Sequence, residues 1–60
     1  MSAPNPRHET IRELLAERGR CSVEELAETL AVTPMTIRRD LGAMEMAGVL
    51  TRTHGGCVLR

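Results

Sequence analysis

The sequence contains no aromatic residue and no lysine, and it has only two cysteines among its 60 residues. Its apolar runs are far shorter than the roughly 18 residues that a membrane-spanning helix needs, so no membrane association is expected. Two cysteines are too few for a disulfide scaffold, and no export signal is visible, so we expect a cytoplasmic protein with reduced thiols. A chain of this size buries only about 60% of its unfolded surface, which leaves no room for a deep substrate pocket. We therefore expect neither an enzyme nor a cofactor site.

The charges balance over the whole chain but not along it. Eight arginines oppose eight acids, so the formal net charge is zero, which by itself argues against a nucleic-acid partner. Residues 1–32 carry four arginines and six glutamates, a net of −2, whereas residues 33–60 carry four arginines and two acids, a net of +2. The C-terminal half is thus the candidate basic surface. Arginine suits phosphate and guanine edges better than lysine does, although a codon-usage bias of the source explains the lack of lysine equally well.

Two helices are predicted in the acidic half. Asn5, which is followed by a proline, is a side-chain cap that starts a helix over residues 6–18. The small, polar residues 1–5 before it are expected to be disordered. The sequence Ser22-Val-Glu-Glu25 matches a capping box and predicts a second, shorter helix over residues 23–31.

A third helix is predicted to start almost at once. Thr33, again followed by a proline, repeats the start signal, and Gly48 closes the helix. Ile37, Leu41 and Met44 form its inward stripe at helical spacing. A turn this tight prevents the second and third helices from lying antiparallel along their length, and it is typical of a helix-turn-helix.

The last twelve residues predict a β-hairpin. Residues 49–53 alternate and are rich in β-branched side chains, residues 54–56 form a turn, and residues 57–60 return as a strand. A hairpin is marginal alone, so it should pack on the helices and pair with a short extended segment at residues 20–22. The expected fold is mainly α with a small β-hairpin, a winged helix-turn-helix of three helices plus a wing, forming one domain over residues 6–60.

The outward face of the third helix carries small or flexible side chains around two arginines. At about 100° per residue, the positions that point away from the core are Met35, Arg39, Gly42 and Met46. The positions at the flanks of this face are Arg38, Thr36 and Ala43. A merely solvated helix face normally alternates acids and bases with long charged side chains. This face is therefore shaped to approach a partner.

The tight helical turn suggests how such a partner would be bound. In a helix-turn-helix the N-terminal part of the second helix enters the DNA major groove, so Met35, Thr36 and Arg39 are the candidates for contacting base edges. Thr33, Thr36 and Arg38 are better placed for phosphate, and the helix N-terminus adds main-chain donors.

An alternative is that the two arginines merely form ion pairs within the domain. Their candidate partners are Asp40, Glu45 and the acidic second helix. Asp40 lies toward the core side, where its expected role is local: bonding Thr36 or holding an arginine.

The predicted wing offers further contacts. Arg52 can lie along the DNA backbone or enter a narrowed minor groove. Gly55 and Gly56 permit a positive-φ turn and a close approach to phosphate. His54 either adds a pH-sensitive phosphate contact or merely stabilises the turn.

Cysteines and histidines supply four potential metal ligands, but their spacing does not fit a metal site. Cys21 and Cys57 with His8 and His54 contain no closely spaced pair of the kind found in zinc fingers or ribbons, so no metal is expected. The two cysteines approach each other if their segments pair in the small sheet. We interpret them as two small buried hydrophobic residues rather than as a disulfide.

Five motifs carry a more specific resemblance. In chain order they are Glu25-Leu-Ala27, Val32-Thr33, Thr36-Ile-Arg-Arg-Asp-Leu41, Gly48-Val-Leu-Thr-Arg52 and His54-Gly-Gly56. Together they resemble the N-terminal DNA-binding domain of the DeoR family of bacterial transcription regulators, over about residues 7–58. Pro34 and Met35 occupy variable positions of that pattern, and Cys57 stands where a small residue such as alanine is usual.

The resemblance implies a function. It implies binding to double-stranded operator DNA, with the third helix as recognition helix and the hairpin as wing. It also implies repression of operons, commonly for sugar or nucleoside catabolism, relieved by a phosphorylated sugar that binds a separate C-terminal domain outside these 60 residues. Because the net charge is zero, we expect a homo-oligomeric full-length protein to bind paired half-sites.

A rival hypothesis comes from a different functional class. A winged-helix protein-interaction module would dock a partner on Met35, Ala43 and Met46. The salt dependence of binding separates the two hypotheses, because affinity for DNA falls steeply with salt and affinity through an apolar protein contact does not.

Overall fold

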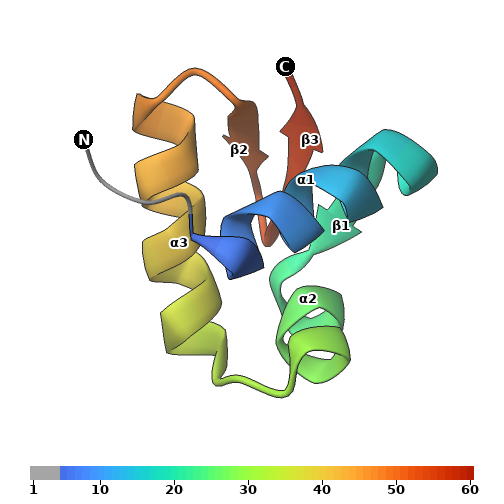
Figure 1. Cartoon of the computed structure of the whole chain (residues 1–60), viewed down its shortest axis with the longest axis vertical. Coiled ribbons are helices and arrows are strands. Elements are labelled where there is room, and N and C mark those ends of the chain that lie inside the picture. The colour runs from blue at the N-terminus through green and yellow to red at the C-terminus, as the bar shows by residue number, and fades with distance from the viewer. Residues whose placement is uncertain (1–4) are drawn as a thin grey trace.

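Three helices and a three-stranded sheet make up the fold (Figure 1). The computed structural model describes residues 5–60, and the expected disorder of residues 1–5 therefore lies, apart from Asn5, outside the described residues. In chain order the elements are α1 (Pro6–Arg18), β1 (Arg20–Ser22), α2 (Val23–Leu30), α3 (Pro34–Met46), β2 (Leu50–Thr53) and β3 (Gly56–Leu59). This is the predicted winged helix-turn-helix, with β2 and β3 as the wing.

The helices begin where their capping residues predict. The Asn5 side chain accepts the N–H of Arg7 at 2.9 Å at the start of α1. At the start of α2, the Ser22 hydroxyl accepts the N–H of Glu25 at 3.0 Å, and the Glu25 carboxylate accepts the N–H of Ser22 at 3.4 Å. These reciprocal bonds complete the predicted capping box.

Helix α2 ends one residue earlier than predicted. Ala31 adopts a left-handed conformation with φ of 56°, and the following N–H, that of Val32, donates to the Ala27 carbonyl at 3.0 Å. This geometry ends the helix and turns the chain within three residues into α3. A left-handed alanine is costly, so the sequence gives no indication of this stop.

The sheet is antiparallel, with strand order β1-β3-β2. The central strand β3 pairs with β2 through the turn at residues 54–55 and with β1 from the other side, which confirms the predicted pairing of the hairpin with residues 20–22. The wing strands begin and end within one residue of the predicted bounds. Helix α1 lies across the front of the view in Figure 1, and the hairpin lies behind it beside the C-terminal part of α3.

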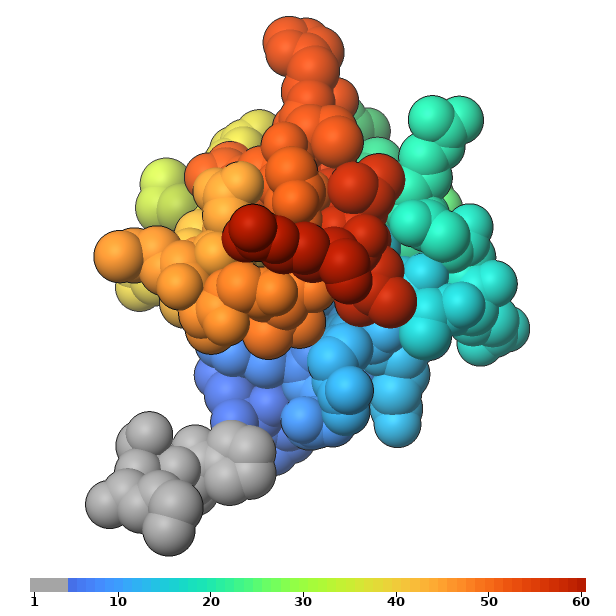
Figure 2. Space-filling model, turned by 90° about the horizontal axis from the view of Figure 1, so that it is seen from above, coloured from blue at the N-terminus to red at the C-terminus, as the bar shows by residue number. Residues whose placement is uncertain are grey.

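One apolar core holds these elements together. It takes side chains from every helix and every strand, and its buried members are Ile11, Leu15, Cys21, Val23, Leu26, Ala27, Ile37, Leu41, Met44, Leu50 and Cys57. Only the first residue of β2, Leu50, belongs to this core, because the other three residues of the strand are exposed. In Figure 2 an orange side chain of the wing segment extends beyond the rest of the surface, on the side of the molecule away from α1.

Candidate nucleic-acid interface

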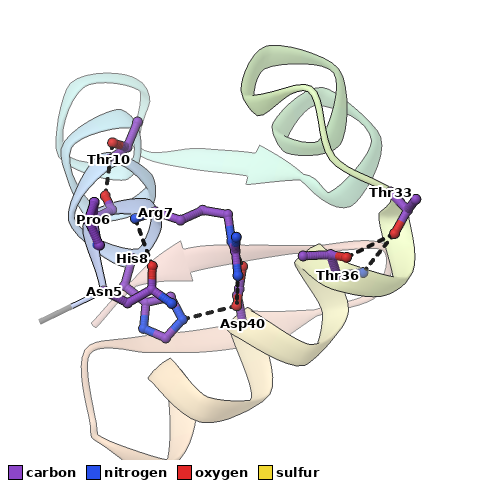
Figure 3. Close-up of polar contacts among 8 residues, drawn as sticks. All are labelled: Asn5, Pro6, Arg7, His8, Thr10, Thr33, Thr36 and Asp40. Carbon is purple, nitrogen blue, oxygen red and sulfur yellow. Dashed lines mark hydrogen bonds and ion pairs between the residues drawn. The ribbon is translucent and has the colours of Figure 1, made fainter. Parts of the chain in front are cut away.

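Two threonines build the first turn of α3. The Thr33 hydroxyl accepts the Thr36 N–H at 3.2 Å, and the two hydroxyl oxygens lie 3.0 Å apart (Figure 3). Pro34 has no N–H, and that of Thr36 is bonded to the cap, so Met35 is the residue of this turn whose N–H has no partner within residues 5–60. The turn therefore offers an anion one main-chain donor beside two partly accessible hydroxyls.

The two sides of α3 differ as predicted. The inward stripe of Ile37, Leu41 and Met44 is buried, whereas Arg38 and Arg39 are exposed. The ion pairs in the described part of the chain involve Arg7, His8, Arg12 and Arg18 as their cationic partners. The structure thus gives no support to the alternative in which the two α3 arginines pair within the domain.

The remaining outward positions of α3 are apolar or small. Met35 is 68% exposed and Met46 is 92% exposed. Gly42 is half-buried, but its Cβ direction points into open space, as predicted for an outward position. Nothing in the domain lies within 4 Å of a Cβ placed on Gly42, so the packing of the domain does not require glycine there. A glycine inside a helix is destabilising. Here the absence of a side chain leaves the backbone of α3 uncovered at this position.

Asp40 is the one charged residue that is buried within residues 5–60, with 5% of its surface exposed. The Arg7 guanidinium donates to both carboxylate oxygens, through Nε to Oδ2 and through Nη2 to Oδ1 at 3.0 Å. The His8 Nε2 lies 3.1 Å from Oδ1 (Figure 3). Hydrogen bonds from Arg7 lower the pKa of Asp40, and they outweigh the opposing effect of burial.

This cluster has two consequences for the surface of α3. The contacts of Arg7 and His8 with Asp40 connect the first turn of α1 to the middle of α3. The cluster also compensates the Asp40 charge on the buried side of α3, away from the exposed Arg38 and Arg39. Of the two local roles predicted for Asp40, holding an arginine is confirmed, whereas the Thr36 hydroxyl bonds Thr33 instead.

The wing places Arg52 and His54 on the surface. Both side chains are exposed, and Gly55 takes the positive φ, 77°, that the turn between the strands requires. Gly56 was expected to share this role, and that expectation is wrong. Gly56 is buried in β3, where a Cβ would overlap the Cys21 carbonyl oxygen, so glycine is needed there for the close approach of two strands.

Comparison with known proteins agrees with this geometry. Residues 7–60 match the DeoR-like helix-turn-helix domain. The chain belongs to this family. It is a helix-turn-helix domain of the DNA-binding class, and the family resemblance expected from its motifs is confirmed. No solved structure shows a significant match to this DeoR-like domain.

Three curated relatives of the DeoR-like domain are repressors by name. The chain is 46% identical over 52 residues to the HTH-type transcriptional repressor CsqR of Escherichia coli K12, covering 87% of this chain and 20% of the relative. It is 52% identical over 50 residues to the lactose phosphotransferase system repressor of Streptococcus mutans, covering 83% and 20%. It is 45% identical over 53 residues to the glycerol-3-phosphate regulon repressor of Escherichia coli K12, covering 88% and 21%. The chain thus spans about a fifth of the length of these relatives.

The two cysteines of the DeoR-like domain face each other across β1 and β3. Cys21 and Cys57 are register partners, and both are buried and free. Burial raises the pKa of both thiols, that of Cys57 to about 11. The predicted burial of both cysteines is confirmed.

Within residues 5–60 no group of three or more His, Cys, Asp or Glu side chains is arranged to hold a metal ion. None of the helices in the described part of the chain has the length and apolar character to cross a membrane.

Sequence reasoning missed three residues that shape this surface. Arg7 and His8 lie 33 and 32 residues from Asp40, and Glu45 bonds the wing. An acid on the inward side of an amphipathic helix does indicate that a cationic partner is needed. Nothing in the sequence says which arginine supplies it.

Proposed function

We propose that this chain is the sequence-specific DNA-binding part of a bacterial transcriptional repressor and that it carries no catalytic activity. In this proposal α3 lies in the major groove and the wing contacts the neighbouring backbone. The observation that supports it most directly is the exposure of Arg38 and Arg39 without an ion-pair partner in the described residues. The adjacent Asp40 does not engage them, because it lies on the buried side of α3, where it binds Arg7 and His8.

Base recognition falls to the first two turns of α3. Arg39 can bond the O6 and N7 atoms of a guanine, which contributes about 1–3 kcal/mol of discrimination against other bases. Met35 supplies an apolar contact to a thymine methyl group, and Thr36 lies on the same turn with its hydroxyl next to the Thr33 oxygen. These three residues set the sequence preference in this proposal.

Phosphate contacts surround the recognition helix. Thr33 and Arg38 bind phosphates on one side, together with the free main-chain N–H of Met35. The wing contributes Arg52 and His54, and Gly55 lets the turn approach the backbone. These contacts set position and salt dependence rather than sequence preference.

The whole regulator needs more than this domain. The relatives are named as repressors of a lactose phosphotransferase system and of a glycerol-3-phosphate regulon. We therefore propose a cytoplasmic homo-oligomeric repressor of a sugar or nucleoside catabolic operon, which a phosphorylated sugar releases through a domain outside this chain. A domain of zero net charge binds a single half-site weakly, so two copies on paired half-sites supply the operator affinity.

Fluorescence anisotropy of this chain with labelled DNA tests the proposal. One duplex is selected from random sequences by the domain, the other is its scrambled counterpart, and each is titrated at two salt concentrations. Arg39→Ala is compared with Arg12→Ala, which removes the same charge from the exposed side of α1. We expect Arg39→Ala to weaken binding to the selected duplex about tenfold or more and Arg12→Ala to change it little.

Two results would contradict the proposal. Equal affinity for both duplexes, unaffected by Arg39→Ala, refutes base recognition by α3. Binding to DNA that hardly changes with salt refutes phosphate contact, because each neutralised phosphate makes the affinity fall more steeply with salt.

The exposure of Met46 and Met35 favours a protein-interaction module as the second candidate. That module predicts a protein partner whose affinity is nearly insensitive to salt.

A further inference from the structure

Glu45, in the last turn of α3, is bonded to the wing. Its carboxylate accepts the main-chain N–H of Arg52 at 2.9 Å. Arg52 lies in β2, at the edge of the sheet, with Cys57 as its register partner in β3. The contact therefore joins the recognition helix directly to the strand that carries the wing arginine.

The N–H of Arg52 faces away from the sheet. In an antiparallel pair, residues alternate between those that bond the partner strand and those that point outward. The N–H of Arg60 donates to the Val49 carbonyl at 3.2 Å, so position 49 bonds inward and position 52, three residues later, points outward. Without Glu45 this N–H would be an open donor on an edge strand, available to water but not to β3.

Little else holds this part of β2 against α3. Leu50 is fully buried, but Thr51, Arg52 and Thr53 are exposed, so apolar packing anchors only the first residue of the strand. The connection from α3 to β2 is three residues long and includes Gly48 with φ of 81°. The hydrogen bond from the Arg52 N–H to Glu45 is thus the polar contact that connects Arg52 to α3.

Both acidic residues of the C-terminal half, residues 33–60, form hydrogen bonds within the domain. Asp40 is held by Arg7 and His8, and Glu45 binds a main-chain N–H. An acid beside a DNA-binding surface repels phosphate, which weakens binding unless the acid has another role. A main-chain bond to the wing is such a role.

We propose that Glu45 is a positioning residue for DNA binding, which fixes the wing so that Arg52 and the α3 arginines engage one duplex together. The inference rests on the proposed function, in which Arg52 contacts DNA. Glu45 itself touches no nucleotide. It acts through the main chain of Arg52, so its effect on affinity depends on the Arg52 side chain.

Five variants of this chain test the proposal: Glu45→Gln, Glu45→Ala, Arg52→Ala and the two double variants that combine Arg52→Ala with each of the Glu45 substitutions. Glutamine keeps an acceptor oxygen at the same length, whereas alanine removes it, and both lose the charge. We expect Glu45→Ala to bind the selected duplex about threefold to tenfold more weakly than Glu45→Gln does, as loss of one hydrogen bond implies. A matched pair on α2, Glu28→Gln and Glu28→Ala, should show no such difference.

The double-variant comparison separates positioning from a general effect on folding. If Glu45 acts by placing Arg52, the difference between alanine and glutamine at position 45 disappears when Arg52 is already alanine. Amide hydrogen exchange gives a readout without DNA: the Arg52 N–H should exchange faster in Glu45→Ala than in Glu45→Gln. Glu45→Met, which keeps side-chain length without an acceptor oxygen, replaces alanine if that variant does not fold.

The outcomes distinguish this inference from the proposed function. If Arg52→Ala weakens DNA binding but Glu45→Ala and Glu45→Gln bind alike, the positioning role is refuted and the proposed function stands. A difference that persists in the Arg52→Ala background also refutes it, because Glu45 then acts elsewhere. If Arg52→Ala leaves affinity unchanged, the wing contact fails, and the positioning role fails with it.

Discussion

Replacing Asp40 by asparagine should lower the free energy of unfolding by about 2 kcal/mol at about pH 7. Asp40 is 5% exposed, and its carboxylate receives two hydrogen bonds from Arg7 beside the His8 contact. Breaking a buried ion pair costs about 3–5 kcal/mol when the other charge stays buried. The Arg7 side chain is 34% exposed and can return to water, so the cost falls below that range. Asparagine keeps one acceptor but turns an NH₂ group toward the donors.

A loss of this size is large for such a small domain. A domain of this length has a total stability of about 3–9 kcal/mol. One kcal/mol corresponds to about 4–8 °C in the melting midpoint at this size, so Asp40→Asn should lower the midpoint by about 8–16 °C. Thermal unfolding followed by far-ultraviolet circular dichroism measures this shift.

The effect should depend on pH in a defined direction. Arg7 holds the folded-state pKa of Asp40 below its ordinary value, so the ionised carboxylate stabilises the fold above the unfolded pKa of about 3.9. That stabilisation is lost as the pH falls through the lowered, folded-state value. The difference between wild type and Asp40→Asn should therefore be full at about pH 7 and shrink below about pH 4.

An exposed ion pair on α1 provides the control. Glu9 accepts a bond from Arg12 at 2.9 Å, but both side chains are more than half exposed. Glu9→Gln should leave the melting midpoint unchanged within error, because water replaces the bond. If Asp40→Asn melts like wild type at neutral pH, or if its deficit is the same at acidic pH, the cluster does not stabilise the domain and the reasoning is wrong.

Three further predictions concern the glycines and thiols. Gly42→Ala should raise the midpoint by the equivalent of about 0.5–1 kcal/mol, since its Cβ meets open space; a lower midpoint would contradict this. Gly56→Ala should destabilise more than Gly55→Ala in urea unfolding, because a Cβ at 56 overlaps the Cys21 carbonyl, whereas at 55 only the positive φ costs about 1–2 kcal/mol. Both buried thiols should react with a thiol reagent far more slowly in the folded than in the unfolded, unreduced protein; fewer than two thiols in the latter would indicate a disulfide.

The local elements of this protein were largely predictable from its sequence. Caps act over three or four residues, so Asn5, Ser22 and Thr33 locate the three helix starts correctly. The apolar period of α3 identified its buried and exposed sides, and with them the candidate DNA contacts. The left-handed Ala31 was missed, because it contradicts the local preference of alanine.

The sequence by itself determined the order of elements, the wing and the family, because these depend on periodicity, capping and short motifs. Only the tertiary structure decided which groups meet across elements. It paired Asp40 with Arg7, placed Cys21 opposite Cys57, and gave Gly56 a packing role instead of a turn role. It also joined Glu45 to the wing. Such contacts depend on how the helices and strands are arranged in space, and a pattern read along one element cannot specify its distant partner.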